Sequence, residues 1–407
     1  MKRYWSLFVA LFAFPVAANA EVPKDDSYSK GEYIYHLSDC GACHTSRTGA
    51  PLAGGLSFPT PFGYIYSSNI TPDKENGIGS WSYDDFANAM RKGIAKDGHH
   101  LYPAMPYPSY SKITDEDLKA LYDYLMHRVK PQTTANRDPD IHWPLTMRWP
   151  LSIWNMLYTE GKPFKPRADQ NAEWNRGAYL VQGPGHCGSC HTPRGIAVQE
   201  KSFDDTDPTY LSGGEIYGWY SPSLRNLKLS KEEIIDLLRE GRSKHKAIAG
   251  AMDEVVTQST QYMTTEDLNA IATYLLSFKD QELSSPTPPA SMPQAAKMNG
   301  EALYANYCST CHGMKGEGVD YVIPKLIDNP TVNRQDPSTL IRILLEGGET
   351  PPTQKHLPYA MPGYKWLLDD RDIADITNYI RTSWGNNGSL VTPKDIKKVR
   401  TYTTTIP

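Results

Sequence analysis

The stretch Cys187-Gly-Ser-Cys190-His191 occurs in two further forms, Cys40-Gly-Ala-Cys43-His44 and Cys308-Ser-Thr-Cys311-His312. Together these three pentapeptides use all six cysteines of the 407-residue chain, and a histidine follows each pair. Six cysteines in an exported chain would ordinarily predict three disulfides. Here every cysteine stands in the same C-x-x-C-H spacing, which favours a different chemistry.

The C-x-x-C-H spacing is the attachment signature of c-type haem. Two thiols three residues apart lie on one turn of helix, where they can add to both vinyl groups of one porphyrin, and the next imidazole binds the iron. A thioredoxin-like centre needs a single motif in a βαβ setting, and a zinc knuckle needs four ligands. The sequence therefore predicts three covalently bound c haems. Their predicted attachment and proximal-ligand residues are Cys40, Cys43, His44, Cys187, Cys190, His191, Cys308, Cys311 and His312.

A methionine follows each pentapeptide at a comparable place. Met105, Met252 and Met361 lie 12, 11 and 14 residues after a glycine that ends a predicted helix. A thioether is a soft, neutral ligand that can complete six-coordinate iron opposite histidine, and it raises the haem potential. These methionines are therefore the predicted distal ligands, whereas Met263, a rival of Met252, is expected to pack in the core.

Histidine is the competing distal ligand. His100, His245 and His356 lie near the three methionines, but their distances from the repeat landmarks do not match. We expect them at the surface or near haem propionates, so that all three irons have histidine and methionine as ligands.

A helical pattern repeats around each pentapeptide. A short helix that begins near Gly31, Gly177 or Gly300 precedes the cysteines, and a longer amphipathic helix closes each repeat. The predicted fold class is all-α, with three tandem class I cytochrome c-type domains that each bind one covalent haem c. The expected organisation is a signal peptide over 1–20, domains over 21–130, 171–283 and 294–390, a Trp/Pro-rich connecting segment over 131–170, a Pro/Ser linker over 284–293 and a polar tail over 391–407.

The amino terminus predicts export. Residues 1–20 combine Lys2 and Arg3 with a short apolar stretch and an Ala-Asn-Ala site, so cleavage is expected after Ala20. The mean hydropathy of -0.53 excludes a multi-pass membrane protein, and a net charge of -4 without a basic stripe argues against a nucleic-acid partner.

Four further features carry smaller predictions. The Pro324 carbonyl can accept a hydrogen bond from His312 and so set its tautomer. Arg194 either pairs with a haem propionate or is solvated. The Trp-rich stretch 143–158 lies at a membrane interface, against a partner, or over the first haem. The chain after Trp384 shows no amphipathic helix.

Several long strings resemble one family. They include SSNITPDKENGIGSWSYDDF (67–86), DGHHLYPAMPY (97–107), WNRGAYLVQGPGHCGSCHTPR (174–194), VVTQSTQYMTTEDL (255–268) and YCSTCHGMKGEG (307–318). With three haem motifs, the chain resembles the triheme cytochrome c subunits of bacterial membrane-associated alcohol, gluconate and sugar dehydrogenases. The resemblance implies that a separate catalytic subunit, with flavin or pyrroloquinoline quinone and in some complexes a small subunit beside it, passes electrons through this chain to ubiquinone at the periplasmic face of the inner membrane.

The predicted function is one-electron relay without catalysis by this chain alone. Six-coordinate haems leave no open iron site, and the flavin or quinone cofactor belongs to the partner. A free periplasmic shuttle and a haem peroxidase are the alternatives. Co-purification of a dehydrogenase would exclude the first, and strong peroxidase turnover would favour the second.

Overall fold

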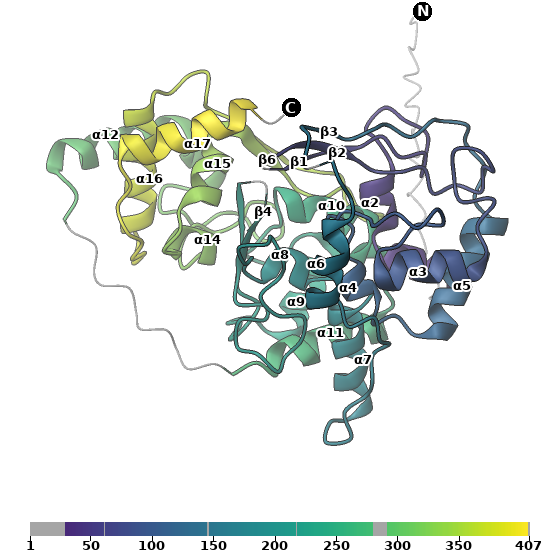
Figure 1. Cartoon of the computed structure of the whole chain (residues 1–407). Helices are drawn as coiled ribbons and strands as arrows, with labels where there is room; N and C mark the ends of the chain where they lie inside the picture. Colours follow the sequence, from purple (N-terminus) through teal and green to yellow (C-terminus); the bar gives the residue numbers. More distant parts are fainter. Residues whose placement is uncertain (1–28, 61, 145, 217, 280–290, 406–407) are drawn as a thin grey trace, which may run out of the picture.

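The computed structural model describes residues 29–60, 62–144, 146–216, 218–279 and 291–405 (Figure 1). The predicted signal peptide over 1–20 and most of the linker over 284–293 lie outside the described residues. The predicted order of helices around each pentapeptide is present in all three repeats.

The first repeat places its pentapeptide between helices with well-formed ends. Ser82 and Thr114 accept hydrogen bonds from the backbone N–H of Asp85 and Asp117, and Gly93 ends its helix with a left-handed φ of 62°. The elements are α1 (Lys30–Leu37), α2 (Cys40–His44), β1 (Ser57–Thr60), β2 (Gly63–Tyr66), α3 (Tyr83–Lys92), α4 (Tyr107–Tyr110), α5 (Asp115–His127) and β3 (Asp140–Ile141), with α6 (Pro150–Tyr158) in the connecting segment.

The second repeat is built in the same way. Ser230 and Thr264 cap their helices, and Gly241 ends the first of them with φ 67°. The elements are α7 (Ala172–Gln182), α8 (Gly188–His191), β4 (Gly214–Ile216), β5 (Trp219–Ser221), α9 (Lys231–Glu240), α10 (Ala251–Gln258), the 3-10 helix η1 (Thr260–Tyr262) and α11 (Thr265–Leu276).

The third repeat, green to yellow in Figure 1, lies beside the other two. Asp369 accepts hydrogen bonds from the backbone N–H of Arg371 and Asp372, as expected of a cap, and Gly347 ends the preceding helix. The elements are α12 (Gln294–Tyr307), α13 (Ser309–His312), α14 (Pro330–Asn333), α15 (Ser338–Glu346), β6 (Gly347–Glu349), β7 (Ala360–Pro362), α16 (Asp370–Thr382) and α17 (Pro393–Thr405).

The glycine that opens each repeat allows two helices to cross closely. A Cβ on Gly31 would lie 2.2 Å from the Ala120 carbonyl oxygen of α5. A Cβ on Gly177 would lie 2.0 Å from that of Ala270, and one on Gly300 would lie 2.4 Å from that of Asp375. The entry helix of each repeat therefore packs on its last helix at a point where only glycine fits.

The all-α fold class is wrong. Short antiparallel strands form a three-stranded sheet of order β1-β2-β3 and two hairpins, β4-β5 and β6-β7. Strands of two to four residues are too short to show the alternation by which a strand is recognised in a sequence. The β1-β2 pair and the β4-β5 hairpin each follow a pentapeptide, and the β6-β7 hairpin carries Met361.

The prediction of three separate domains also needs correction, because the first two repeats share one hydrophobic core. This core runs from Ile34 to Phe278, and a second core runs from Tyr304 to Ile396 in the third repeat. The individual boundaries given above remain predictions.

A reciprocal pair of tyrosines joins the first two repeats. Tyr33 of α1 donates to Asp267 of α11 at 2.8 Å, and Tyr179 of α7 donates to Asp117 of α5 at 2.6 Å. Both tyrosines lie two residues after the opening glycine, where the third repeat has Ala302 instead. The first two repeats are therefore joined by reciprocal tyrosine–aspartate hydrogen bonds. The third repeat lacks the tyrosine needed for such a bond.

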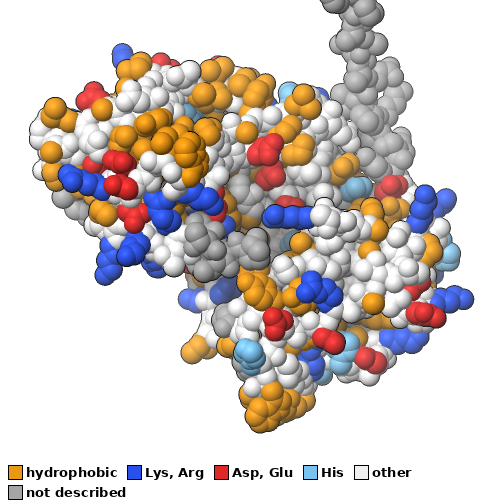
Figure 2. All heavy atoms as spheres, turned by 90° about the horizontal axis from the view of Figure 1, so that it is seen from above, with side chains coloured by type: hydrophobic (Ala, Val, Ile, Leu, Met, Phe, Trp, Pro, Cys, Tyr) orange, Lys and Arg blue, Asp and Glu red, His pale blue; other side chains and the backbone are white. Residues whose placement is uncertain are grey.

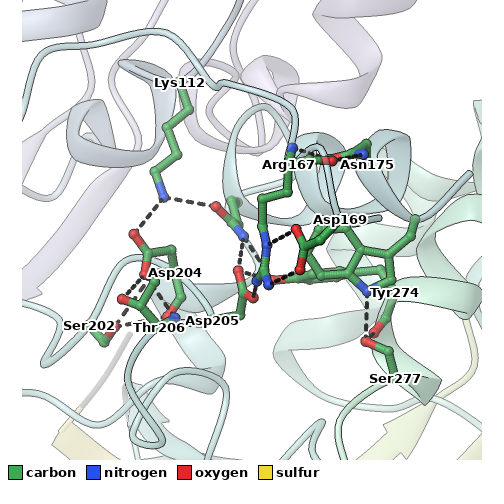
Figure 3. Close-up of polar contacts among 12 residues, drawn as sticks. Lys112, Arg167, Asp169, Asn175, Ser202, Asp204, Asp205, Thr206, Tyr274 and Ser277 are labelled. Atoms are coloured by element: carbon green, nitrogen blue, oxygen red, sulfur yellow. Dashed lines mark hydrogen bonds and ion pairs between the residues drawn. The ribbon is translucent and has the colours of Figure 1, made fainter. Parts of the chain in front are cut away.

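Ion pairs add to this junction (Figure 3). Lys112 of the first repeat lies 3.9 Å from Asp204 of the second, and Arg167 contacts Asp169 at 2.9 Å and Asp205 at 2.7 Å. Arg167 thus ties the end of the connecting segment to the second repeat.

The carboxyl-terminal tail is a helix, contrary to expectation. Ile396 of α17 is fully buried, and Arg400 pairs with Asp370 at 2.7 Å. The apolar positions of α17 are few, so the hydrophobic pattern was too weak to predict a packed helix.

Candidate haem sites

Each pentapeptide forms a short helical turn. The three turns are α2, α8 and α13, and all six cysteines are free of disulfides. Burial raises the pKa of the Cys43, Cys187 and Cys308 thiols to about 12. Five of the six thiols are buried or half-buried, and Cys311 is exposed. Two thiols on one turn fit the attachment of a porphyrin through both vinyl groups.

Each pentapeptide histidine is held by a backbone carbonyl. Nδ1 lies 2.7 Å from the Ser68 oxygen for His44, 2.6 Å from the Pro222 oxygen for His191 and 3.2 Å from the Pro324 oxygen for His312. A bond at Nδ1 leaves Nε2 for iron. The Pro324 prediction is confirmed.

Burial also lowers the pKa of all three imidazoles, to about 4 for His191. A neutral imidazole at neutral pH is the form that binds a metal. The donor set therefore fits c-type haem, whose iron these imidazoles would bind.

The three methionines occupy different local structures. Met105 lies in the loop before α4, Met252 is the second residue of α10, and Met361 is in β7 opposite Gly348. All three are partly buried, and Met105 and Met361 pack against the two hydrophobic cores. Their ligation of iron stays a prediction. Met263 is 5% exposed within the first core, which confirms its packing role.

The histidines considered as rival ligands make polar contacts elsewhere. The His100 ring nitrogen contacts the Asn155 amide at 3.1 Å, that of His245 lies 3.2 Å from Asp320, and that of His356 lies 3.7 Å from Glu240. Among the described residues, no cluster of three or more His, Cys, Asp or Glu side chains is arranged to bind a metal ion.

Arg194 contacts the second pentapeptide itself. Its guanidinium donates to the backbone carbonyls of Ser189 and Val198. Arg194 therefore fastens the loop after the pentapeptide to its helical turn, and its pairing with a haem propionate stays a prediction.

The first two pentapeptides lie close together. Burial raises the pKa of Cys43 to about 12, and the charges of Asp39, Glu254 and Cys190 add to the effect. Cys190 belongs to the second pentapeptide, so the two attachment turns are near enough for their charges to interact.

Glu200 is buried against the second pentapeptide. Its Oε1 accepts a hydrogen bond from Ser189 at 3.1 Å, while its Oε2 has no hydrogen-bond partner among the described residues. Burial raises the pKa of this carboxyl to about 7, although Arg194, Ser189 and Lys112 oppose the rise. Because the unfolded carboxyl titrates near 4.3, folding loses stability as pH rises from about 4 to about 7.

We expect Glu200→Gln to raise the free energy of unfolding at pH 8 by up to about 3 kcal/mol and to change it little at pH 4. Urea denaturation followed by tryptophan fluorescence measures both values. Glu301→Gln, at an exposed position, is the control. An equal effect of Glu200→Gln at the two pH values would contradict this assignment.

The helical repeats, paired cysteines and anchored histidines are those of a c-type cytochrome, and the family described as Cytochrome c matches residues 28–128 and 298–384. The chain is 45% identical to the alcohol dehydrogenase (quinone) cytochrome c subunit of Gluconacetobacter polyoxogenes, over 94% of this chain and 86% of the relative. It is 42% identical to the gluconate 2-dehydrogenase cytochrome c subunit of Pantoea cypripedii, over 98% and 95%. It is 35% identical to the fructose dehydrogenase cytochrome subunit of Gluconobacter japonicus, over 95% and 84%.

The chain therefore belongs to the family of cytochrome c subunits of dehydrogenase complexes. It is an electron-transfer subunit with covalently bound haem c, and its partner is a catalytic dehydrogenase.

Proposed function

We propose that this chain carries three covalent c haems and relays electrons from a dehydrogenase that oxidises an alcohol, sugar or sugar acid to ubiquinone. The observation that carries the proposal is the threefold C-x-x-C-H turn with a carbonyl at each histidine Nδ1. When bound, haem supplies one-electron exchange between ferric and ferrous iron.

The residues of this chain hold the three groups and tune them. The cysteines anchor each porphyrin, and the carbonyls of Ser68, Pro222 and Pro324 orient the proximal imidazoles. Met105, Met252 and Met361 would complete the iron ligation. The iron would then have no open position for a substrate.

The oxidation of the substrate belongs to the catalytic partner, with flavin or pyrroloquinoline quinone as its cofactor and in some complexes a small subunit beside it. The relatives named above serve alcohol, gluconate and fructose dehydrogenases. This range of substrates is consistent with one type of cytochrome subunit that accepts electrons from different catalytic subunits.

Purification of the chain from its native membranes in mild detergent tests the proposal. Gluconate, glucose, fructose, sorbitol and ethanol are added in turn while the haem spectrum is recorded. We expect a larger subunit to co-purify and one substrate to reduce the haems. A chain that comes alone and is reduced by none of them would support the free shuttle instead.

We further propose that the chain acts at the periplasmic face of the inner membrane after cleavage near Ala20. Among the described residues, no helix is both long and apolar enough to cross a bilayer, so the proposed association is peripheral. Figure 2 shows apolar side chains gathered in several patches on one face of the molecule.

Helix α6 supports this membrane association. Trp149, Ile153, Met156 and Leu157 are 63%, 48%, 75% and 63% exposed, and they recur at the spacing of one helix face. On its other side, Trp154 packs on Tyr107 and donates to the Ala197 carbonyl at 3.0 Å. The exposed Lys162 and Lys165 follow the helix, which favours anionic lipid headgroups.

We expect the double substitution Trp149→Ser, Leu157→Ser to weaken binding to vesicles of phosphatidylglycerol and phosphatidylcholine by more than about 100-fold. Each large apolar side chain contributes about 1.5–3 kcal/mol when it leaves water. Flotation of the isolated haem-loaded chain measures the binding, and the equally apolar exposed pair Trp366→Ser, Leu367→Ser is the control. Unchanged flotation of the variant, together with loss of the catalytic subunit when the variant is purified from native membranes, would assign α6 to the partner.

A further inference from the structure

We propose that α15 of the third repeat positions the haem site of the second repeat, through Thr339 and Arg342. The proposal rests on the proposed haem at Cys187–His191. Both residues contact the hairpin β4–β5, which lies more than a hundred residues earlier in the sequence. They lie three positions apart in α15, so they share one face of that helix.

Thr339 holds the backbone of β5. Its hydroxyl oxygen accepts a hydrogen bond from the Tyr220 N–H at 3.1 Å and donates one to the Tyr220 carbonyl at 3.2 Å. Two residues further on, the Pro222 carbonyl lies 2.6 Å from His191 Nδ1. The strand that Thr339 binds is therefore followed directly by the residue whose carbonyl orients the His191 imidazole.

Arg342 supports the same hairpin from its side. The guanidinium lies 4.3 Å from the centre of the Trp219 ring, and an ion pair with Glu346 at 2.6 Å fixes it there. The Trp219 ring in turn lies against Gly250, where a Cβ would come within 2.8 Å of it. Gly250 precedes the predicted ligand Met252 by two residues, so β5 lies next to the backbone that carries Met252 as well as next to Pro222.

The same interface secures the proximal side of the third site. The Lys244 carbonyl accepts a hydrogen bond from the Tyr321 N–H at 3.0 Å, and the His245 carbonyl accepts one from the Lys325 N–H at 3.0 Å. These residues flank Pro324, whose carbonyl lies 3.2 Å from His312 Nδ1. Each of the two repeats therefore braces the histidine anchor of the other.

This arrangement predicts how the second haem responds to a change in α15. A hydrogen bond at Nδ1 increases the donor strength of an imidazole and stabilises ferric iron. Loss of the Thr339 bonds frees β5 to shift away, which weakens the His191–Pro222 bond. The reduction potential of the second haem should then rise, whereas those of the other two should stay.

The test compares Thr339→Val with wild type as full-length, haem-loaded chains. Thr382→Val is the matched control, because its hydroxyl donates only to the Asn378 carbonyl of its own helix among the described contacts. Covalent haem is counted first, and a potentiometric titration of the haem bands follows. The wave of the second haem is identified as the one that is missing when Cys187 and Cys190 are both alanine.

We expect Thr339→Val to carry three attached haems. The reduction potential of its second haem should be higher than in the wild type, and the control should show no change in any potential. Thr339→Ser keeps the hydroxyl and should restore the wild-type titration. If Thr339→Val does not fold, Arg342→Gln should change the reduction potential of the second haem and leave the other two potentials unchanged. Normal haem content with all three waves unchanged in both variants would overturn the inference, whereas fewer than three haems in the wild type would contradict the proposed function itself.

Discussion

Replacing both Cys187 and Cys190 by alanine should lower the covalent haem content from three to two per chain. Both thioether bonds of the second porphyrin come from this one helical turn, so no covalent attachment remains when the two thiols are removed. Acidified acetone extracts haem that is not covalently bound. The pyridine haemochrome absorbance of the extracted protein should therefore fall by about one third.

Ser189→Ala is the control for this result. It changes a side chain on the same turn but leaves both thiols in place, so three haems should remain. An unchanged haem content after loss of Cys187 and Cys190 would mean that the second pentapeptide binds no haem.

Replacing Met252 by leucine should lower the reduction potential of one haem and remove its methionine-to-ferric charge-transfer absorption. Leucine keeps the volume of methionine but has no sulfur to bind iron. Axial ligands set haem potentials over a range of about 0.8 V, so we expect a fall on the order of 0.1 V.

Met263→Leu provides the comparison, because Met263 lies in the core only 11 residues away along the chain. It should leave the absorption and all potentials as in the wild type. If Met263→Leu removes the charge-transfer absorption and Met252→Leu leaves it unchanged, Met263 is the ligand and Met252 is not.

The local features of the sites could be predicted from the sequence because they depend on short spacings. The C-x-x-C-H turns, the caps at Thr114, Thr264 and Asp369, and the glycine ends of helices each involve neighbours within one or two turns. The Pro324 contact was predictable as well, since Pro324 follows His312 by only 12 residues.

The other two histidine anchors were missed because no constant spacing marks them. Ser68 lies 24 residues after His44, and Pro222 lies 31 residues after His191. The intervening loops differ in length, and the strands that deliver these carbonyls are too short for a periodic signal. Only the folded chain brings them together with the imidazoles.

The shared core of the first two repeats has a signal in the sequence. Tyr33 and Tyr179 stand at the same place in their repeats, and the third repeat has Ala302 there. A buried tyrosine hydroxyl needs a polar partner, and here each donates to an aspartate in the first turn of the other repeat's last helix. A comparison of the repeats position by position would have separated the third from the first two.

The most direct test of the relay is to add an oxidised ubiquinone analogue to the purified complex after its substrate has reduced the haems, and to follow the haem absorption with time. If this chain relays electrons to quinone, the haems are reoxidised as the quinone is reduced. Haems that stay reduced while the quinone is consumed would place quinone reduction on another subunit and contradict the role proposed for this chain.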